Sequence, residues 1–186
     1  MGEEGYELLG VQVVFSASDV LDPIIQRFGD KQMLEEMEKV FFADGPNSLG
    51  HSYARLMHGP GDRRDFADVV DLLRAEPLTK RAVVTLCGNG NGKVPCLNAI
   101  QFLVRDGALT TIYFARAQDV YRKFYADGWC IEKMARRVAE ALGVLMGPVT
   151  AFIGSSHVYD ADLAAIREML EQVEPEPMTV GAGVRL

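Results

Sequence analysis

Cys96 is the side chain in this sequence that is best placed for covalent chemistry. It follows Val94 and Pro95 and stands between a glycine-rich run, 88–93, and a strand-like run. A partly exposed thiol becomes a nucleophile where a neighbouring cation favours the thiolate. A lone cysteine more often packs as a small core residue, and the spacing alone favours that second interpretation.

The glycine-rich run 88–93 (GNGNGK) could hold a phosphate through its backbone NH groups. It lacks the spacing and the Ser or Thr of a P-loop, and no helical pattern follows it. We therefore predict a loop between two strands.

Metal ligands are not grouped in the sequence. His51 and His58 could share one face of a helix, but no carboxylate or cysteine completes a metal site around them. The three cysteines, Cys87, Cys96 and Cys130, are an odd number without metal-ligand spacing. We predict no metal site and a reduced, cytoplasmic protein.

The composition is that of an ordinary globular domain. Of 186 residues, 48% are hydrophobic and 24% are charged, and the formal net charge is -7. The acidic balance argues against a nucleic acid polymer as the main partner. No apolar run is long enough to span a membrane, and the first ten residues lack a signal-peptide pattern. We predict a single domain over 1–186.

Strand-like and helix-like patterns alternate along the chain. Helices are expected where apolar residues recur at helical spacing, at 32–42, 64–75, 129–142 and 161–173. Strands are expected at 8–16, 81–87, 98–105, 108–116, 148–154 and 178–186. Asp106-Gly107 predicts a tight hairpin turn, because both positions tolerate a positive φ. Three consecutive strands favour an α+β fold with a mixed or antiparallel sheet and flanking helices.

Five short motifs follow one another at fixed distances from Cys96 onward. They are Pro95-Cys96, Gln101-Phe102, Asp106-Gly107, 116–121 (RAQDVY) and 154–159 (GSSHVY). Upstream lie 49–53 (LGHSY), Lys80-Arg81 and 9–12 (LGVQ). Together these segments resemble the thymidylate synthase family, and the resemblance covers nearly the whole chain.

The resemblance implies a role in the reaction for three groups. Cys96 would be the nucleophile that adds to C6 of a pyrimidine, and Tyr53 would work with ordered water near C5. Glu38 is the choice for the glutamate general acid of the family, with Glu35 and Glu36 as competitors. A solvated helix face is the alternative reading of all three glutamates.

The resemblance also implies how the nucleotide is bound. Arg116 would contact the substrate phosphate and favour the Cys96 thiolate. Lys80 and Arg81 would reach the same phosphate from a partner subunit, so the site would require a homodimer. His157 and Tyr159 would hold the sugar.

The remaining implied site residues are Gln101, Ala117 and Asp119. Gln101, on the Gln-Phe strand of the family, and Ala117 are counted among the substrate-binding positions. Asp119 would help to bind folate or the base, and methylenetetrahydrofolate is the implied cofactor.

Two departures from the family pattern concern the substrate. The base-reading asparagine of the family corresponds to Asp127, and a carboxylate can accept a hydrogen bond from the 4-amino group of cytosine but cannot satisfy O4 of uracil. The alternative reading of Asp127 is an N-cap of the helix at 129–142. Ala117 and Lys80 replace stronger phosphate donors. These exchanges resemble the cytidylate and deoxycytidylate hydroxymethylase branch.

Other departures concern the folate side. The C-terminal tail that covers folate in the family has no counterpart before Leu186, and the insertion with a folate-packing tryptophan is missing between Phe42 and Ser48. The expected activity is therefore 5-hydroxymethylation of CMP or dCMP, on a compact fold truncated at its C-terminus. Thymidylate synthesis on dUMP and a non-catalytic nucleotide binder are the alternatives.

Overall fold

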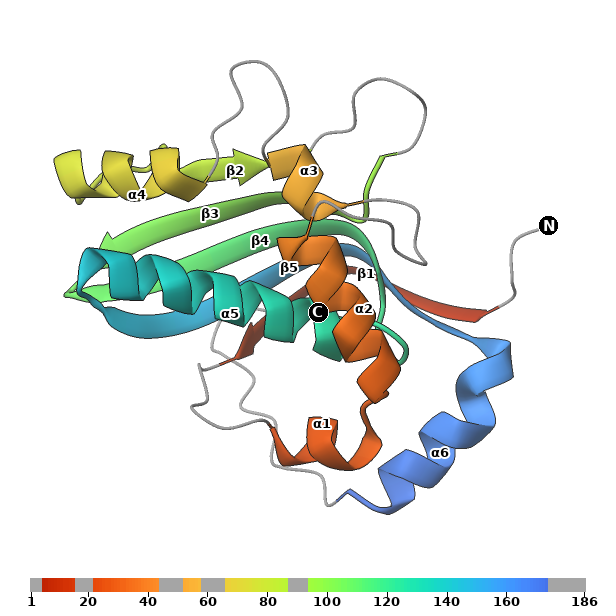
Figure 1. The fold of residues 1–186 in the computed structure, drawn as a ribbon. Helices are drawn as coiled ribbons and strands as arrows, with labels where there is room; N and C mark the ends of the chain where they lie inside the picture. The colour runs from red at the N-terminus through yellow and green to blue at the C-terminus, as the bar shows by residue number, and fades with distance from the viewer. Residues whose placement is uncertain (1–4, 16–21, 44–51, 58–65, 87–93, 174–186) are drawn as a thin grey trace, which may run out of the picture.

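The computed structural model describes residues 5–15, 22–43, 52–57, 66–86 and 94–173. Its described part is built on a five-stranded sheet in the order β1-β5-β4-β3-β2 (Figure 1). The strands are β1 (Gly5–Phe15), β2 (Val83–Thr85), β3 (Leu97–Arg105), β4 (Ala108–Asp119) and β5 (Leu145–Tyr159). β4 and β5 run parallel and the other neighbouring pairs run antiparallel. The predicted α+β class with a mixed sheet is confirmed.

Six α-helices accompany the sheet in the described residues. They are α1 (Pro23–Phe28), α2 (Lys31–Phe42), α3 (Tyr53–Met57), α4 (Phe66–Ala75), α5 (Phe124–Leu142) and α6 (Leu163–Glu171), the last preceded by a 3-10 turn over Asp160–Asp162. The sequence patterns predicted α2, α4, α5 and α6. They missed α1 and α3, which have 6 and 5 residues and are too short to show a helical period.

At two places the backbone has the conformation that the local sequence predicts. The β3–β4 turn has Asp106 at φ 50° and Gly107 at φ 77°, so the positive φ at both positions is confirmed. Gly143 ends α5 in the left-handed conformation, and its NH donates to the carbonyls of Ala139 and Glu140.

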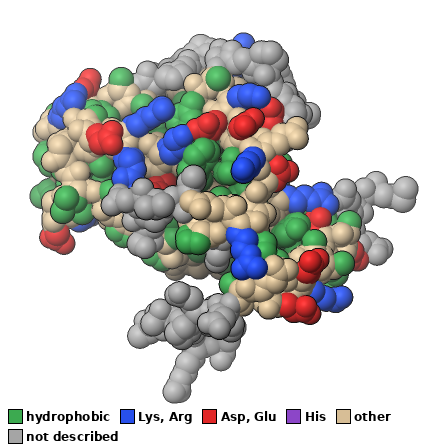
Figure 2. All heavy atoms as spheres, turned by 60° about the horizontal axis from the view of Figure 1, so that its bottom comes forward, with side chains coloured by type: hydrophobic (Ala, Val, Ile, Leu, Met, Phe, Trp, Pro, Cys, Tyr) green, Lys and Arg blue, Asp and Glu red, His purple; other side chains and the backbone are tan. Residues whose placement is uncertain are grey.

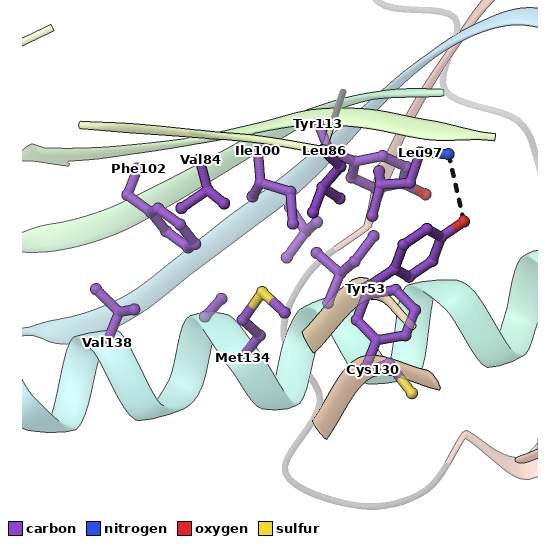
Figure 3. Packing of buried hydrophobic residues seen from close by; sticks show 14 of the residues in the cluster. Tyr53, Val84, Leu86, Leu97, Ile100, Phe102, Tyr113, Cys130, Met134 and Val138 are labelled. Carbon is purple, nitrogen blue, oxygen red and sulfur yellow. Dashed lines mark hydrogen bonds between the residues drawn. The ribbon is translucent and has the colours of Figure 1, made fainter. Parts of the chain in front are cut away.

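The core lies between the sheet and a layer of helices. α5 packs on β4 and β5, and α2 and α4 pack beside it. Figure 3 shows Ile100 and Phe102 of the sheet above Met134 and Val138 of α5. All four are at most 1% exposed, and burial of each contributes roughly 1.5–3 kcal/mol. This layer fixes the position of α5 relative to the ends of β3, β4 and β5.

β5 and α5 extend furthest beyond their predicted bounds. β5 continues to Tyr159 because its last residues pair on both sides, with β1 and with the end of β4. α5 begins at Phe124, five residues before the predicted start. The predicted strand at 178–186 lies outside the described residues.

Candidate active site

Cys96 and Arg116 are in contact at the ends of neighbouring strands. Cys96 is half-buried just before β3, and its carbonyl accepts from the backbone NH of Arg116 on β4 at 2.8 Å. Nη2 of Arg116 lies 3.9 Å from the Cys96 sulfur. The same guanidinium donates to the carbonyls of Val94 and Pro95, so it holds the segment that carries the thiol. The Arg116 guanidinium therefore both supports the segment that carries the thiol and lies beside its sulfur.

Cys130 is the contrasting thiol. It lies on the inner face of α5 and is fully buried. Burial, and then the charges of Asp127 and Glu38, raise the pKa of this thiol well above its ordinary range. A thiol held in its protonated form is a poor nucleophile, so of these two cysteines Cys96 is the one suited to covalent chemistry.

Tyr53 lies next to the Cys96 segment. It comes from α3, is 1% exposed, and its hydroxyl accepts a long hydrogen bond of 3.4 Å from the backbone NH of Leu97 (Figure 3). Burial, and then the charge of Asp127, raise its pKa. Its hydroxyl therefore remains protonated beside the candidate nucleophile.

Asp127 lies in the first turn of α5 and is 4% exposed. It does not cap the helix, because α5 begins at Phe124 with Lys123 at the N-cap position, so the N-cap alternative is wrong. Its Oδ2 accepts a hydrogen bond of 2.8 Å from Nε2 of Gln118, which is itself buried at the end of β4. Asp127 is therefore a buried helix residue and not a loop residue.

Tyr113 and Cys130 complete the surroundings of Asp127. The Tyr113 hydroxyl is buried and has no hydrogen-bond partner among the described residues. Burial, and then the Asp127 charge, raise the pKa of Tyr113. The charge of Asp127 also contributes to the raised pKa of Cys130, so both of these neighbouring groups are held in their neutral forms.

Asp119, His157 and Tyr159 lie together where β4 and β5 end. The parallel register places Asp119 beside His157, and the rings of His157 and Tyr159 meet edge to face at 5.2 Å between centroids. Asp119 Oδ1 accepts from the backbone NH of Arg122, and the Arg122 guanidinium lies 5.0 Å above the Tyr159 ring. These residues lie at the same end of the sheet as Arg116.

Lys80 and Arg81 lie away from the Cys96 segment of the same chain. Phe102 donates its backbone NH to the carbonyl of Ala82, so these two residues flank β3 roughly 17 Å along the strand from Leu97. Both side chains are exposed, and Arg81 forms an ion pair of 2.6 Å with Glu76.

Gln101 and Ala117 also have defined positions. The Gln101 amide donates to the Lys80 carbonyl at 2.8 Å, so in this chain it lies with the Lys80-Arg81 segment and not with Cys96. Ala117 pairs in register with Ser155, whose hydroxyl is hydrogen-bonded to Glu7 of β1. Ala117 has no side-chain donor, so a ligand phosphate near Arg116 would lack one contact at this position.

Of the three candidate glutamates on α2, Glu38 is the one with a described ion pair to α5. It pairs with the ammonium group of Lys133, which also lies 4.3 Å above the Trp129 ring. Glu36 pairs with Lys39 at 2.6 Å and Glu35 is exposed. The position of Glu38 toward α5 favours it over its neighbours, although it is held by a lysine.

A cavity of about 410 Å³ lies elsewhere, between α2, α3, α4 and α5. Its lining is mainly apolar and includes Phe42, Met57 and Val70, with Arg74 and Arg137 at its polar part. It contains none of the predicted site residues. The candidate reactive pair, Cys96 and Arg116, therefore lies at the strand ends, whereas the cavity belongs to the helical layer.

Some predictions fall on parts of the chain that the structure does not describe, namely the segment 49–51, the glycine-rich run 88–93, Cys87 and His58. In the described ranges, no three His, Cys, Asp or Glu side chains are grouped so that they could hold a metal ion. Nor does any described helix have the length and apolarity to cross a membrane. On the face drawn in Figure 2, acidic side chains stand among the basic ones.

Gly154 allows β5 to approach Arg116 closely. A Cβ at Gly154 would lie 2.8 Å from the Arg116 carbonyl oxygen, so Gly154→Ala must shift the backbone of one strand. Gly147 is a matched control, since its Cβ would lie 2.7 Å from the Leu109 carbonyl at the other end of the same strand pair. We expect each alanine variant to lose about 1–3 kcal/mol of stability.

Only Gly154→Ala should impair the site. Displacement of Arg116 relative to Cys96 should lower activity per folded molecule about tenfold to a hundredfold, while Gly147→Ala should keep it. Thermal melts and rates of both variants measure the two effects separately. Equal losses of activity in the two variants would show that the strand pair as a whole, and not Arg116, is responsible.

Comparison with known proteins shows which family this chain matches. The family model described as thymidylate synthase matches residues 30–180. A protein of Methanosarcina barkeri named "Putative thymidylate synthase" is 26% identical over 153 residues, covering 77% of this chain and 69% of that protein. A protein of Methanothermobacter thermautotrophicus with the same name is 29% identical over 148 residues, covering 77% and 67%.

More distant matches agree. The "Thymidylate synthase" of Listeria monocytogenes is 21% identical over 145 residues, which cover 73% of this chain and 46% of that protein. This chain thus spans about two thirds of the two archaeal relatives and under half of the Listeria protein. The crystal structure of thymidylate synthase from T4 phage superposes with a TM-score of 0.73 at 17% identity, over 94% of this chain and 74% of that chain. The last match shows a shared fold.

Proposed function

Because the chain belongs to the thymidylate synthase family, we propose that it transfers a one-carbon unit to C5 of a cytidine monophosphate, CMP or dCMP, and yields the 5-hydroxymethyl nucleotide. The family supports C5 one-carbon transfer to a pyrimidine nucleotide. The choice of cytosine rests on the residues of this chain.

The observation that carries the proposal is the buried carboxylate of Asp127. It lies close enough to Tyr53 for its charge to raise the pKa of that tyrosine, and Tyr53 contacts the residue next to Cys96. We infer that a pyrimidine held over Cys96 presents its polar edge toward Asp127, which corresponds to the base-reading asparagine of the family. A carboxylate accepts from the 4-amino group of cytosine and repels O4 of uracil, and a buried mismatch costs roughly 1–3 kcal/mol.

Cys96 and Arg116 are the proposed reacting and activating groups. The thiolate of Cys96 adds to C6 of the pyrimidine, a carbon–sulfur bond forms, and the electron pair of the C5–C6 double bond makes C5 nucleophilic. Arg116, whose guanidinium lies 3.9 Å from the sulfur, is proposed to pair with the thiolate that attacks. The neutral Tyr53 hydroxyl is proposed to orient water near C5.

His157 and Tyr159 are proposed to bind the sugar, because they offer an imidazole and a phenol at the strand ends that continue the Arg116 edge. Arg116 is proposed to interact with both the thiol of Cys96 and the phosphate of the nucleotide. Ala117 adds no donor, so the phosphate needs further cations. Lys80 and Arg81 are the proposed source.

Methylenetetrahydrofolate is the one-carbon donor of the family and would supply the carbon that C5 accepts. Asp119 fits such a ligand, because a partly buried carboxylate at the rim can accept from the NH groups of a pterin ring. The turn at Arg122 fixes the Asp119 side chain in place.

A homodimer with shared sites is proposed from two features of the sheet. Lys80 and Arg81 lie too far along β3 to reach the Cys96 segment of their own chain. Phe114 and Phe152, paired in register on β4 and β5, are 45% and 42% exposed. Exposed aromatic pairs on a sheet face are typical of a surface that another chain covers.

Subunit complementation tests the shared site. Arg81→Ala protein and Cys96→Ser protein should each be weak alone, and a mixture should recover part of the activity, because one site of a mixed dimer keeps both groups. A mixture of Cys96→Ser with Arg116→Ala protein is the matched control and should not recover, since both groups belong to one chain's site. No recovery in the first mixture after confirmed subunit exchange would assign each site to a single chain.

Product analysis tests the reaction type. The protein should convert a cytidine monophosphate to its 5-hydroxymethyl product, which is heavier by CH2O because the hydroxymethyl group replaces the C5 hydrogen, with no rise in absorbance from dihydrofolate. Water then supplies the hydroxyl oxygen, and tetrahydrofolate is released without giving up a hydride. A 5-methyl product with one dihydrofolate for each turnover would contradict the hydroxymethyl assignment.

A further inference from the structure

The cavity of about 410 Å³ between α2, α3, α4 and α5 takes no part in the proposed reaction. Its volume lies within the range of roughly 300–1,000 Å³ that is typical of small-molecule sites. Phe41, Met57 and Met134 line it and are each at most 2% exposed, so the cavity reaches down to the hydrophobic core. Aromatic rings and thioethers make favourable contacts with aromatic groups, and this lining therefore suits a ligand with an aromatic body.

The cavity exists because α4 presents two neighbouring apolar stripes. Val69 and Leu73 are at most 2% exposed and pack in the core. Phe66 and Val70, one helical turn apart, line the cavity and are only partly buried. Ala67 lines it from the same helix, and its small side chain leaves the space beside it unfilled.

Two arginines and one carboxylate form the polar part of the cavity. Arg74 pairs with Asp71 at 3.1 Å and donates to the carbonyl of Ala141. The Arg137 guanidinium lies 4.5 Å above the Phe42 ring, and it has no carboxylate partner among the described residues. The polar part therefore has one net positive charge, and it lies on Arg137.

We propose that this cavity is a binding site for a small aromatic carboxylate, with Arg137 as the partner of the carboxylate group. A guanidinium that stacks on a ring can still donate two NH groups from its edge to one carboxylate. A single negative charge balances the net charge of the polar part, whereas a second one would face Asp71. The lining contains none of the residues proposed to act on the nucleotide, so neither the base nor the cofactor enters this assignment.

Three probes with the same naphthalene body test the charge requirement: 2-naphthoate, 2-naphthylmethanol and 2-naphthylmethylammonium. By isothermal titration calorimetry, the native protein should bind the carboxylate at least about threefold more tightly than the alcohol, and the ammonium most weakly. The ratio is modest because Arg137 is exposed to solvent. In Arg137→Gln the preference for the carboxylate over the alcohol should disappear. Arg167→Gln, at an exposed arginine on α6, is the matched control and should keep it.

Two tryptophan variants on α4 test the location. Ala67 and Ala75 are both exposed on this helix, but only Ala67 lines the cavity. Ala67→Trp should weaken the binding of 2-naphthoate at least about tenfold, because the indole occupies the space that the probe needs. Ala75→Trp should bind it like the native protein. Thermal melts check that each variant folds, and if Ala67→Trp does not fold, Arg137→Gln decides.

Absence of 2-naphthoate binding, equal affinity in the two tryptophan variants, or an unchanged carboxylate preference in Arg137→Gln would overturn the assignment. So would binding that Ala67→Trp leaves intact and CMP or dCMP abolishes, because the probe would then lie at the Cys96 site. Weaker binding at higher protein concentration would show that a second copy of the chain covers the cavity, and would also overturn it. A protein that binds 2-naphthoate as expected but does not act on cytidine nucleotides would contradict the proposed function alone.

Discussion

Cys96→Ser is expected to abolish turnover, with a loss of at least about a thousandfold. A serine hydroxyl is not ionised near neutral pH, and the neighbouring Arg116 guanidinium is a cation that cannot take its proton. The substitution removes no large buried side chain, so the fold should remain. Rate and circular dichroism should be measured on the same preparation.

Cys130→Ala is the matched control for that experiment. Cys130 is fully buried on α5, so this variant should lose stability through a small cavity while it keeps the reaction. Activity retained in Cys96→Ser, or lost equally in both folded variants, would remove Cys96 from the mechanism.

Asp127→Asn is expected to move the preference from cytosine toward uracil by tenfold to several hundredfold, on the order that one buried polar pair supplies. The reason is that an amide can donate to O4, where the carboxylate repels it. The measurement is the ratio of kcat/KM for the two nucleotides. Asp106→Asn at the β3–β4 turn is the control, because asparagine tolerates the positive φ there, and its ratio should equal that of the native protein. An unchanged ratio in Asp127→Asn would mean that Asp127 does not face the base.

The parts of the fold that could be predicted from sequence are those with a local cause. Asp106-Gly107 and Gly143 have the positive φ values that their residue types tolerate, and α2 and α4 follow their apolar spacing. Three consecutive strands predicted a mixed or antiparallel sheet, because a hairpin signal between two of them requires antiparallel neighbours. The parallel pairing of β4 with β5 makes the sheet mixed.

The start of α5 could not be predicted, because packing between distant segments decides it. Gly128 lies within the first turns, where glycine costs about 1 kcal/mol relative to alanine, and the segment begins without a side-chain cap. A Cβ at Gly128 would lie 3.5 Å from the Phe15 ring of β1, which is an ordinary van der Waals contact. The ring of Phe124, the first residue of the helix, meets the same Phe15 ring edge to face, so a contact with a distant strand lies at the helix start.

The site was predictable in its residue types and less so in its contacts. The proximity of Arg116 to Cys96 is present in the structure, whereas Arg81 pairs with Glu76 and Glu38 with Lys133. Gln118 was missed because its importance comes from a hydrogen bond to Asp127. The end of β4 and the start of α5 bring these two residues together. No sequence period marks such a pair.

Tritium release from C5 is the measurement that tests the central claim most directly. The C5 hydrogen is displaced whether the product is the 5-methyl or the 5-hydroxymethyl nucleotide. Tritium release therefore measures the transfer of the carbon unit itself. With methylenetetrahydrofolate present, 5-tritiated CMP or dCMP should release tritium to water, and the matching uridine nucleotide should do so at least about tenfold more slowly in kcat/KM. Release from the uridine nucleotides alone, or from neither base, would contradict the account.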